Sequence, residues 1–90
     1  MVSAFYVHLE VDDRPGVLAQ VAQILGMQDI SVKSVVQKGI GEQARLVMVV
    51  HPTKESSFAA ALQLMSQLDF LRSPPRAIRV IEEEFLSSPE

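Results

Sequence analysis

The spacing of the hydrophobic residues changes abruptly at residues 12–16. From Phe5 to Val11 every second residue is apolar, whereas from Val17 to Leu25 the apolar residues recur with the helical period. Alternation predicts a strand with one buried face, and the second spacing predicts an amphipathic helix. The chain is therefore expected to begin with a strand over 5–11 and a helix over about 15–27.

A hairpin is expected to follow this first pair of elements. β-Branched residues are frequent over 30–37, and a turn at Gly39-Ile40-Gly41-Glu42 separates them from an apolar run over 44–51. Two such runs joined by a short glycine-containing turn predict two antiparallel strands. Pro52 and Thr53 are expected to end the second run, because proline cannot donate to a strand ladder and threonine is a good helix N-cap.

A second helix and a broken strand complete the pattern. Apolar residues recur at helical spacing over about 54–67, which predicts the helix. Phe70-Leu71 and 77–81 predict a last strand, which Pro74-Pro75 interrupts and thereby assigns to a sheet edge. Beyond it, residues 82–90 are expected to form a tail.

The order βαββαβ predicts an α+β fold of the ferredoxin-like type. Because strand–helix–strand crossovers are almost always right-handed, both helices are expected on one face of a four-stranded antiparallel sheet. The first and third strands are central in this plan. The run from Leu46 to Val50 is apolar at successive positions, as in a strand that is covered on both sides or contacts a partner. Ninety residues make a single domain, with a core expected over about 4–81.

Composition argues against several functions that such a fold can carry. The net charge is −3 and the eight basic residues are scattered, so neither nucleic acid nor a membrane is an expected partner. The chain has no cysteine, and His8 and His51 fall on different strands, so no metal or other cofactor is expected. No nucleophile has a base at a useful spacing, so no catalysis is predicted. A cytoplasmic protein is expected.

The junction between the first strand and the first helix is the best candidate for a binding site. Pro15 suits the first turn of a helix, and Gly16 has no side chain that would keep a ligand from the backbone. Free N–H groups near Gly16, Val17 and Leu18, beside the positive end of the helix dipole, could hold a carboxylate. Asp13 could cap the helix or bind the ammonium group of the same amino acid, and both roles can coexist.

These residues resemble a known family. The segment Asp13-Arg14-Pro15-Gly16-Val17-Leu18, followed by Asp29-Ile30-Ser31-Val32 at the second strand, is similar to the ACT domain, and the similarity covers about residues 4–81. The resemblance implies a regulatory module that binds an amino acid between two copies of the domain. The implied effector-binding residues are Val11, Asp13, Arg14, Pro15, Gly16, Val17, Leu18, Ile30 and Ser31.

Longer stretches resemble a narrower group, the C-terminal ACT segment of bacterial homoserine dehydrogenases. They are residues 34–39, 44–53 and 72–80. This resemblance implies a non-catalytic C-terminal fragment of an NAD(P)-dependent oxidoreductase, with the enzyme's catalytic domain as a partner and threonine as the favoured feedback effector. Serine-binding members carry asparagine where this chain has Asp13 and Ser31, which argues against serine. A homodimer or larger assembly is expected, and a dimerisation module without an effector remains the alternative.

Overall fold

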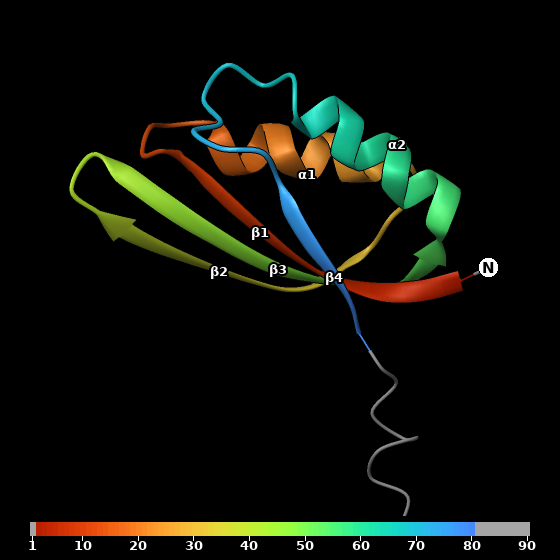
Figure 1. Ribbon diagram of the computed structural model, residues 1–90. Coiled ribbons are helices and arrows are strands. Elements are labelled where there is room, and N and C mark those ends of the chain that lie inside the picture. Colours follow the sequence, from red (N-terminus) through yellow and green to blue (C-terminus); the bar gives the residue numbers. More distant parts are fainter. Residues whose placement is uncertain (1, 81–90) are drawn as a thin grey trace, which may run out of the picture.

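The structure, a computed structural model, describes residues 2–80, which form one sheet with two helices on the same side (Figure 1). The elements are β1 (Val2–Asp12), α1 (Val17–Met27), β2 (Val32–Ile40), β3 (Gln43–Lys54), α2 (Glu55–Met65) and β4 (Arg76–Val80). The strands lie in the order β2-β3-β1-β4, each antiparallel to its neighbours. The predicted ferredoxin-like fold is confirmed, with the first and third strands central. Ile81 and the expected tail at 82–90 lie outside the described residues.

The core lies between the helices and one face of the two central strands. Over 5–11 in β1 and 44–50 in β3, every second residue is buried against the apolar sides of α1 and α2. Phe5 and Phe58 stack with their ring centroids 3.9 Å apart, which joins β1 to α2. The buried residues are Phe5, Val7, Leu9, Val11, Val17, Val21, Ile24, Leu25, Ile30, Ala44, Leu46, Met48, Val50, Phe58, Ala61, Met65 and Phe70.

β3 passes directly into α2 without a loop. It continues through Pro52 and Thr53, so the predicted strand end at these residues is wrong. Thr53 pairs with Ser3 of β1, and a bulge lies next to this pair. A bulge leaves a residue outside the hydrogen-bonded ladder, which is why proline is tolerated here. The N-cap of α2 is Lys54 rather than Thr53.

α1 ends at Met27, as predicted, and the chain then turns sharply back to the sheet. Asp29 has the positive φ, 64°, that glycine more often supplies after a helix. The Asp29 N–H donates to the Gly26 carbonyl at 3.0 Å. The Ile30 N–H donates to the Leu25 carbonyl at 2.9 Å. This pair of bonds is a Schellman motif, and it places the side chain of Ile30 in the core.

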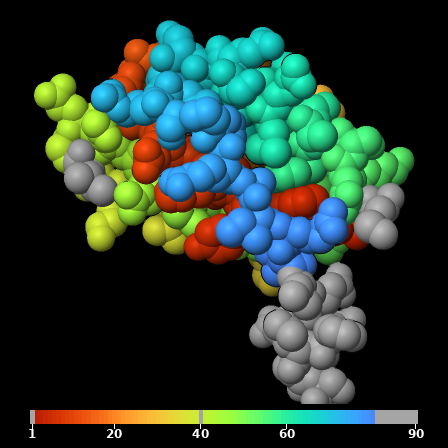
Figure 2. All heavy atoms as spheres, viewed as in Figure 1, coloured from red at the N-terminus to blue at the C-terminus, as the bar shows by residue number. Residues whose placement is uncertain are grey.

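The segment that precedes β4 crosses the end of β1. Figure 2 shows this part of the chain, in blue, lying across the front of the molecule beside the red atoms of β1. Phe70 and Leu71 are not part of the last strand as predicted, because β4 begins only at Arg76, after the two prolines. The Phe70 carbonyl instead accepts a hydrogen bond from the Asp12 N–H at 2.9 Å, and Leu71 makes a single bridge to Val11. Phe70 and Leu71 thus hold the end of β1, next to the loop that leads into α1.

Candidate ligand site at the start of α1

Ion pairs hold the end of β1 and the β1–α1 loop, residues 13–16, to the segment that precedes β4. Arg14 donates to the Asp69 carboxylate at 2.7 Å. Its guanidinium carbon lies 5.6 Å from the centre of the Phe70 ring. Arg72 donates to the Asp12 carboxylate, also at 2.7 Å. Exposed pairs of this kind stabilise a fold only slightly. Their effect here is to fix the path of the loop, and the Arg14 guanidinium is engaged within the chain.

Gly16 determines where α1 begins. Its φ of 87° is left-handed, and the helix starts at Val17, two residues later than predicted. Pro15 lies in the turn before the helix rather than in its first turn, because a left-handed residue cannot continue a right-handed helix. No atom lies within 4 Å of the place that a Cβ on Gly16 would take. The backbone beside Gly16 is therefore open.

The backbone N–H groups in the first turn of α1 have no carbonyl acceptor within the helix. The Gln20 N–H makes the first helical bond, to the Gly16 carbonyl at 3.0 Å. The N–H groups of Val17, Leu18 and Ala19 precede this bond and have no partner within the helix. No side chain among residues 2–80 caps α1, and its first turn contains no acidic residue. An anion placed there would meet both free donors and the positive end of the helix dipole.

Asp13 lies beside this helix start but does not cap it, so the capping role predicted for Asp13 is wrong. The Asp13 N–H donates to the Glu42 carbonyl at 3.0 Å and ties the loop to the turn between β2 and β3. The carboxylate oxygen Oδ2 of Asp13 lies 3.2 Å from the place that a Cβ on Gly39 would take. The missing side chain at Gly39 makes room for this carboxylate. Its predicted role as the partner of an ammonium group stays a prediction.

A shallow depression of about 440 Å³ surrounds the start of α1. The residues that line it are Asp13, Arg14, Pro15, Gly16, Val17, Leu18, Ala19 and Gln37. Gln37 was missed from the sequence. It pairs with Leu46, whose side chain is buried under the helices, so Gln37 points to the helix side of β2. Val35, Gln37 and Gly39 share the helix side of β2, and Gln37 is the polar residue among them. The alternation of side chains along a strand could have predicted this position.

Three residues implied by the family resemblance lie outside this depression. Val11 and Ile30 are buried in the core, with 1% and 5% of their surface exposed. Ser31 is exposed, and its carbonyl accepts a hydrogen bond from the His51 N–H at 2.9 Å, near the start of β2. β2 runs parallel to β1, so its start lies at the opposite end of the sheet from the β1–α1 loop. A single chain therefore does not bring Ser31 to the loop.

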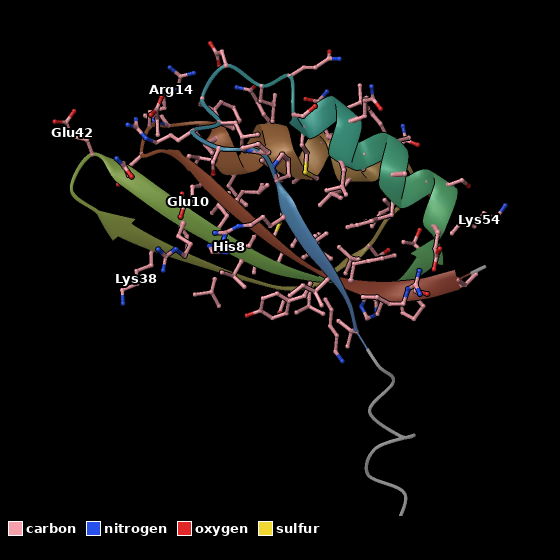
Figure 3. The ribbon with its side chains drawn as sticks, in the orientation of Figure 1. His8, Glu10, Arg14, Lys38, Glu42 and Lys54 are labelled. Atoms are coloured by element: carbon pink, nitrogen blue, oxygen red, sulfur yellow. The ribbon has the colours of Figure 1, made fainter. Side chains whose placement is uncertain are left out.

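The two ends of the sheet are easily followed in Figure 3. Arg14, on the loop, and Glu42, in the β2–β3 turn, lie at the same end, and Lys54 lies at the other. Over residues 2–80 there is no group of three histidine or acidic side chains that could hold a metal ion. In the same range, no helix has the length and apolar character needed to cross a membrane.

The chain matches a known protein family and the C-terminal part of several enzymes. The family model described as the ACT domain matches residues 6–70. A homoserine dehydrogenase of Pseudomonas aeruginosa is 38% identical over 81 residues, which are 87% of this chain and 19% of the enzyme. A homoserine dehydrogenase of Neisseria gonorrhoeae is 30% identical over 82 residues, again 19% of the enzyme. The chain thus spans about a fifth of the length of these relatives and matches their C-terminal part.

Solved structures agree with the family match. The crystal structure of a homoserine dehydrogenase from Thiobacillus denitrificans superposes with a TM-score of 0.84 and 33% identity, covering 91% of this chain and 18% of that enzyme. A putative glycine cleavage system transcriptional repressor superposes with a TM-score of 0.76 over 93% of this chain and 49% of that protein. Its identity is only 16%, so this second likeness is one of fold alone.

Proposed function

The chain belongs to the ACT domain family, and we propose that it is a regulatory module whose depression at the start of α1 binds a free amino acid. The observation that carries the proposal is the helix start itself. Its first-turn N–H groups have no side-chain cap, the first turn itself contains no acidic residue, and the depression opens beside them. This arrangement favours a small ligand that carries a carboxylate.

The charges around the depression favour an amino acid over a simple anion. The carboxylate of the ligand would accept hydrogen bonds from the N–H groups of Val17 and Leu18, and the Asp13 carboxylate would pair with its ammonium group. The Gln37 carboxamide both donates and accepts, so it could bind a hydroxyl on the ligand side chain. A hydroxyl-bearing amino acid such as threonine would use all three groups.

A second copy of the chain would complete the site. β2 is an edge strand, and every residue from Ser31 to Gly39 is exposed, which leaves a strand edge open for pairing. If two β2 strands pair antiparallel about a twofold axis at Val36, Lys33 of one copy stands opposite Gly39 of the other. Ser31 of the second copy would then approach the β1–α1 loop. This is how the loop and Ser31, which are apart in one chain, could form one effector site.

The relation to homoserine dehydrogenase suggests what the module controls. We infer that the chain is the C-terminal feedback segment of such an enzyme, with threonine as the favoured effector and the enzyme's catalytic domain as its partner. The 38% and 33% identities support this assignment. Effector binding would shift a conformational equilibrium of the parent enzyme, with a typical coupling of about 1–3 kcal/mol. A parent enzyme of this kind works in the cytoplasm.

Titration of the chain with each of the twenty amino acids tests the proposal. We expect threonine to shift the backbone amide signals of Gly16, Val17 and Gln37 in nuclear magnetic resonance spectra, with a smaller shift at Ser31 through the second copy. If these amide signals do not shift with any amino acid up to millimolar concentration, effector binding is contradicted. The same chain would then act as a dimerisation module, an alternative that the exposed edge of β2 also supports.

A further inference from the structure

The outer face of the sheet, which points away from the helices, exposes several large apolar side chains. Antiparallel sheets of this kind usually place polar residues on the open side. Here Ile78 of β4 pairs with Tyr6 of β1, and Tyr6 pairs with Val49 of β3. Val36 of β2 pairs with Val47 of β3 in the next row. Ile78, Val36 and Tyr6 are 69%, 63% and 44% exposed.

A band of charge borders this apolar surface. Glu10 of β1 stands opposite Arg45 of β3, and Arg45 stands opposite Lys38 of β2, on the same outer face. Glu10 is 3.8 Å from Arg45 and 3.7 Å from Arg76, distances too long for direct hydrogen bonds. Two cations side by side in a sheet repel each other. Figure 3 shows Glu10 and His8 close together on β1, with Lys38 on β2, which β3 separates from β1.

We propose that two copies of the chain associate by packing these outer faces against each other. The geometry is a twofold axis that runs parallel to the strands between β1 and β3. Such an axis places β1 of one copy over β3 of the other, because the two strands are adjacent in the sheet. Face-to-face sheets pack about 10 Å apart with their strands nearly aligned, which agrees with this axis.

Two pairs of outer-face residues become complementary under this operation. Tyr6 of each copy lies over Val49 of the other, since the two residues share a row of the sheet. For the same reason Glu10 of each copy lies over Arg45 of the other. The association buries the apolar rows and gives each Arg45 a second carboxylate. This charge match favours a second copy over an unrelated partner.

The interface is small, so the association is weak. With strands about 4.8 Å apart and about 3.3 Å per residue, eight steps along each of three strands and four along the shorter β4 give a face of about 440 Å². Stable complexes bury about 800 Å² on each partner. We therefore expect weak and transient self-association. It is separate from pairing at the β2 edge and would join one edge-paired dimer to another.

Sedimentation analysis of matched variants tests the interface. Ile78 and Met27 are similarly exposed, at 69% and 62%, but Met27 lies at the end of α1, away from the outer face. Ile78→Glu should weaken self-association at least about tenfold, because it buries a charge opposite another copy, whereas Met27→Glu should leave the sheet-face step unchanged. Neither residue belongs to the β2 edge. Equal behaviour of wild type and Ile78→Glu, including a wild type that stays monomeric, would overturn the proposal and leave the face to another partner.

Mixing two charge variants provides a second test. Glu10→Arg puts arginine at both positions 10 and 45, and Arg45→Glu puts glutamate at both, so each variant should repel its own copies. An equimolar mixture places arginine over glutamate at both contacts and should associate at least about tenfold more tightly than either variant alone. Circular dichroism verifies that both variants are folded. A mixture that sediments like its two components would overturn the proposed pairing of positions 10 and 45.

Discussion

The two helices begin in opposite ways, although neither has a side-chain cap. α2 follows an extended residue, Lys54, and carries Glu55 in its first turn. The Glu55 carboxylate accepts a hydrogen bond from Ser3 at 3.0 Å and pairs with Arg79 at 2.6 Å. α1 follows the left-handed Gly16 and has no acid in its first turn. The positive end of α2 is thus compensated from within the fold, whereas the first turn of α1 has no acid of its own, and it is there that we propose the ligand binds.

The largest effect is expected from removing the glycine that starts α1. Gly16→Val should destabilise the chain by about 1–2 kcal/mol, because a side chain at φ 87° is strained even though the space beside it is open. Urea unfolding measures this change. Gly26→Ala is the control: its φ is not positive and its added Cβ meets nothing within 4 Å, so it should stabilise α1 by about 0.5 kcal/mol. Equal responses of the two variants would contradict a special role for Gly16.

Giving α1 an acid of its own should make its start resemble that of α2. Ala19→Glu places a carboxylate in the first turn, where it competes with the ligand for the same donors and the same dipole. We expect threonine binding, followed by calorimetry, to weaken at least about tenfold while the helix gains about 0.3–1 kcal/mol. Ala22→Glu, one turn later on the exposed side of α1, is the matched control and should bind normally. Normal binding by Ala19→Glu would exclude the helix start as the carboxylate site.

The reverse change at α2 should reduce stability without affecting the ligand. Glu55→Gln removes the charge that pairs with Arg79 and compensates the dipole, and we expect a loss of about 1 kcal/mol in thermal or urea unfolding. Amino-acid binding at α1 should be unchanged within error. A parallel loss of binding would show that the two helix starts are coupled through the sheet.

The smallest effect concerns pH and lies in the sheet rather than at either helix start. Partial burial lowers the pKa of His8 below 6.5, and the charges of Arg76 and Arg45 lower it further, while Glu10 opposes them. The unfolded chain therefore binds a proton more readily than the folded one, so stability is highest above pH 6.5 and falls as pH drops towards the lowered pKa. His8→Gln should reduce the change in melting temperature between pH 7 and pH 5. An unchanged slope would assign the effect to another group.

The elements were predictable from the sequence because their signals are local. Alternation in β1 and β3 and the helical spacing in α1 and α2 identified the buried faces, and the right-handed crossover rule then gave the sheet order. The errors arose where distant residues decide the backbone. Arg14 is held by Asp69, 55 positions away, and the loop that this pair braces starts α1 at Val17 rather than near Pro15.

The candidate site was predicted in part for the same reason. Asp13 through Leu18 are consecutive, so their grouping in one depression needed no tertiary information. Gln37 joins them from another strand and was missed. Ile30 and Ser31 came from a family resemblance, and the fold buries the first and holds the second at the far end of the sheet. A role for Ser31 in binding would need a second copy, which no single sequence can position.

The direct passage from β3 into α2 has a mechanical consequence. α2 is continuous with a central strand, so it cannot tilt without bending the sheet itself. α1, in contrast, is suspended between two short connections, residues 13–16 and 28–31, each of which contains one residue with positive φ. A metabolite bound at the start of α1 would therefore contact the helix whose orientation depends on two short loops rather than on a central strand.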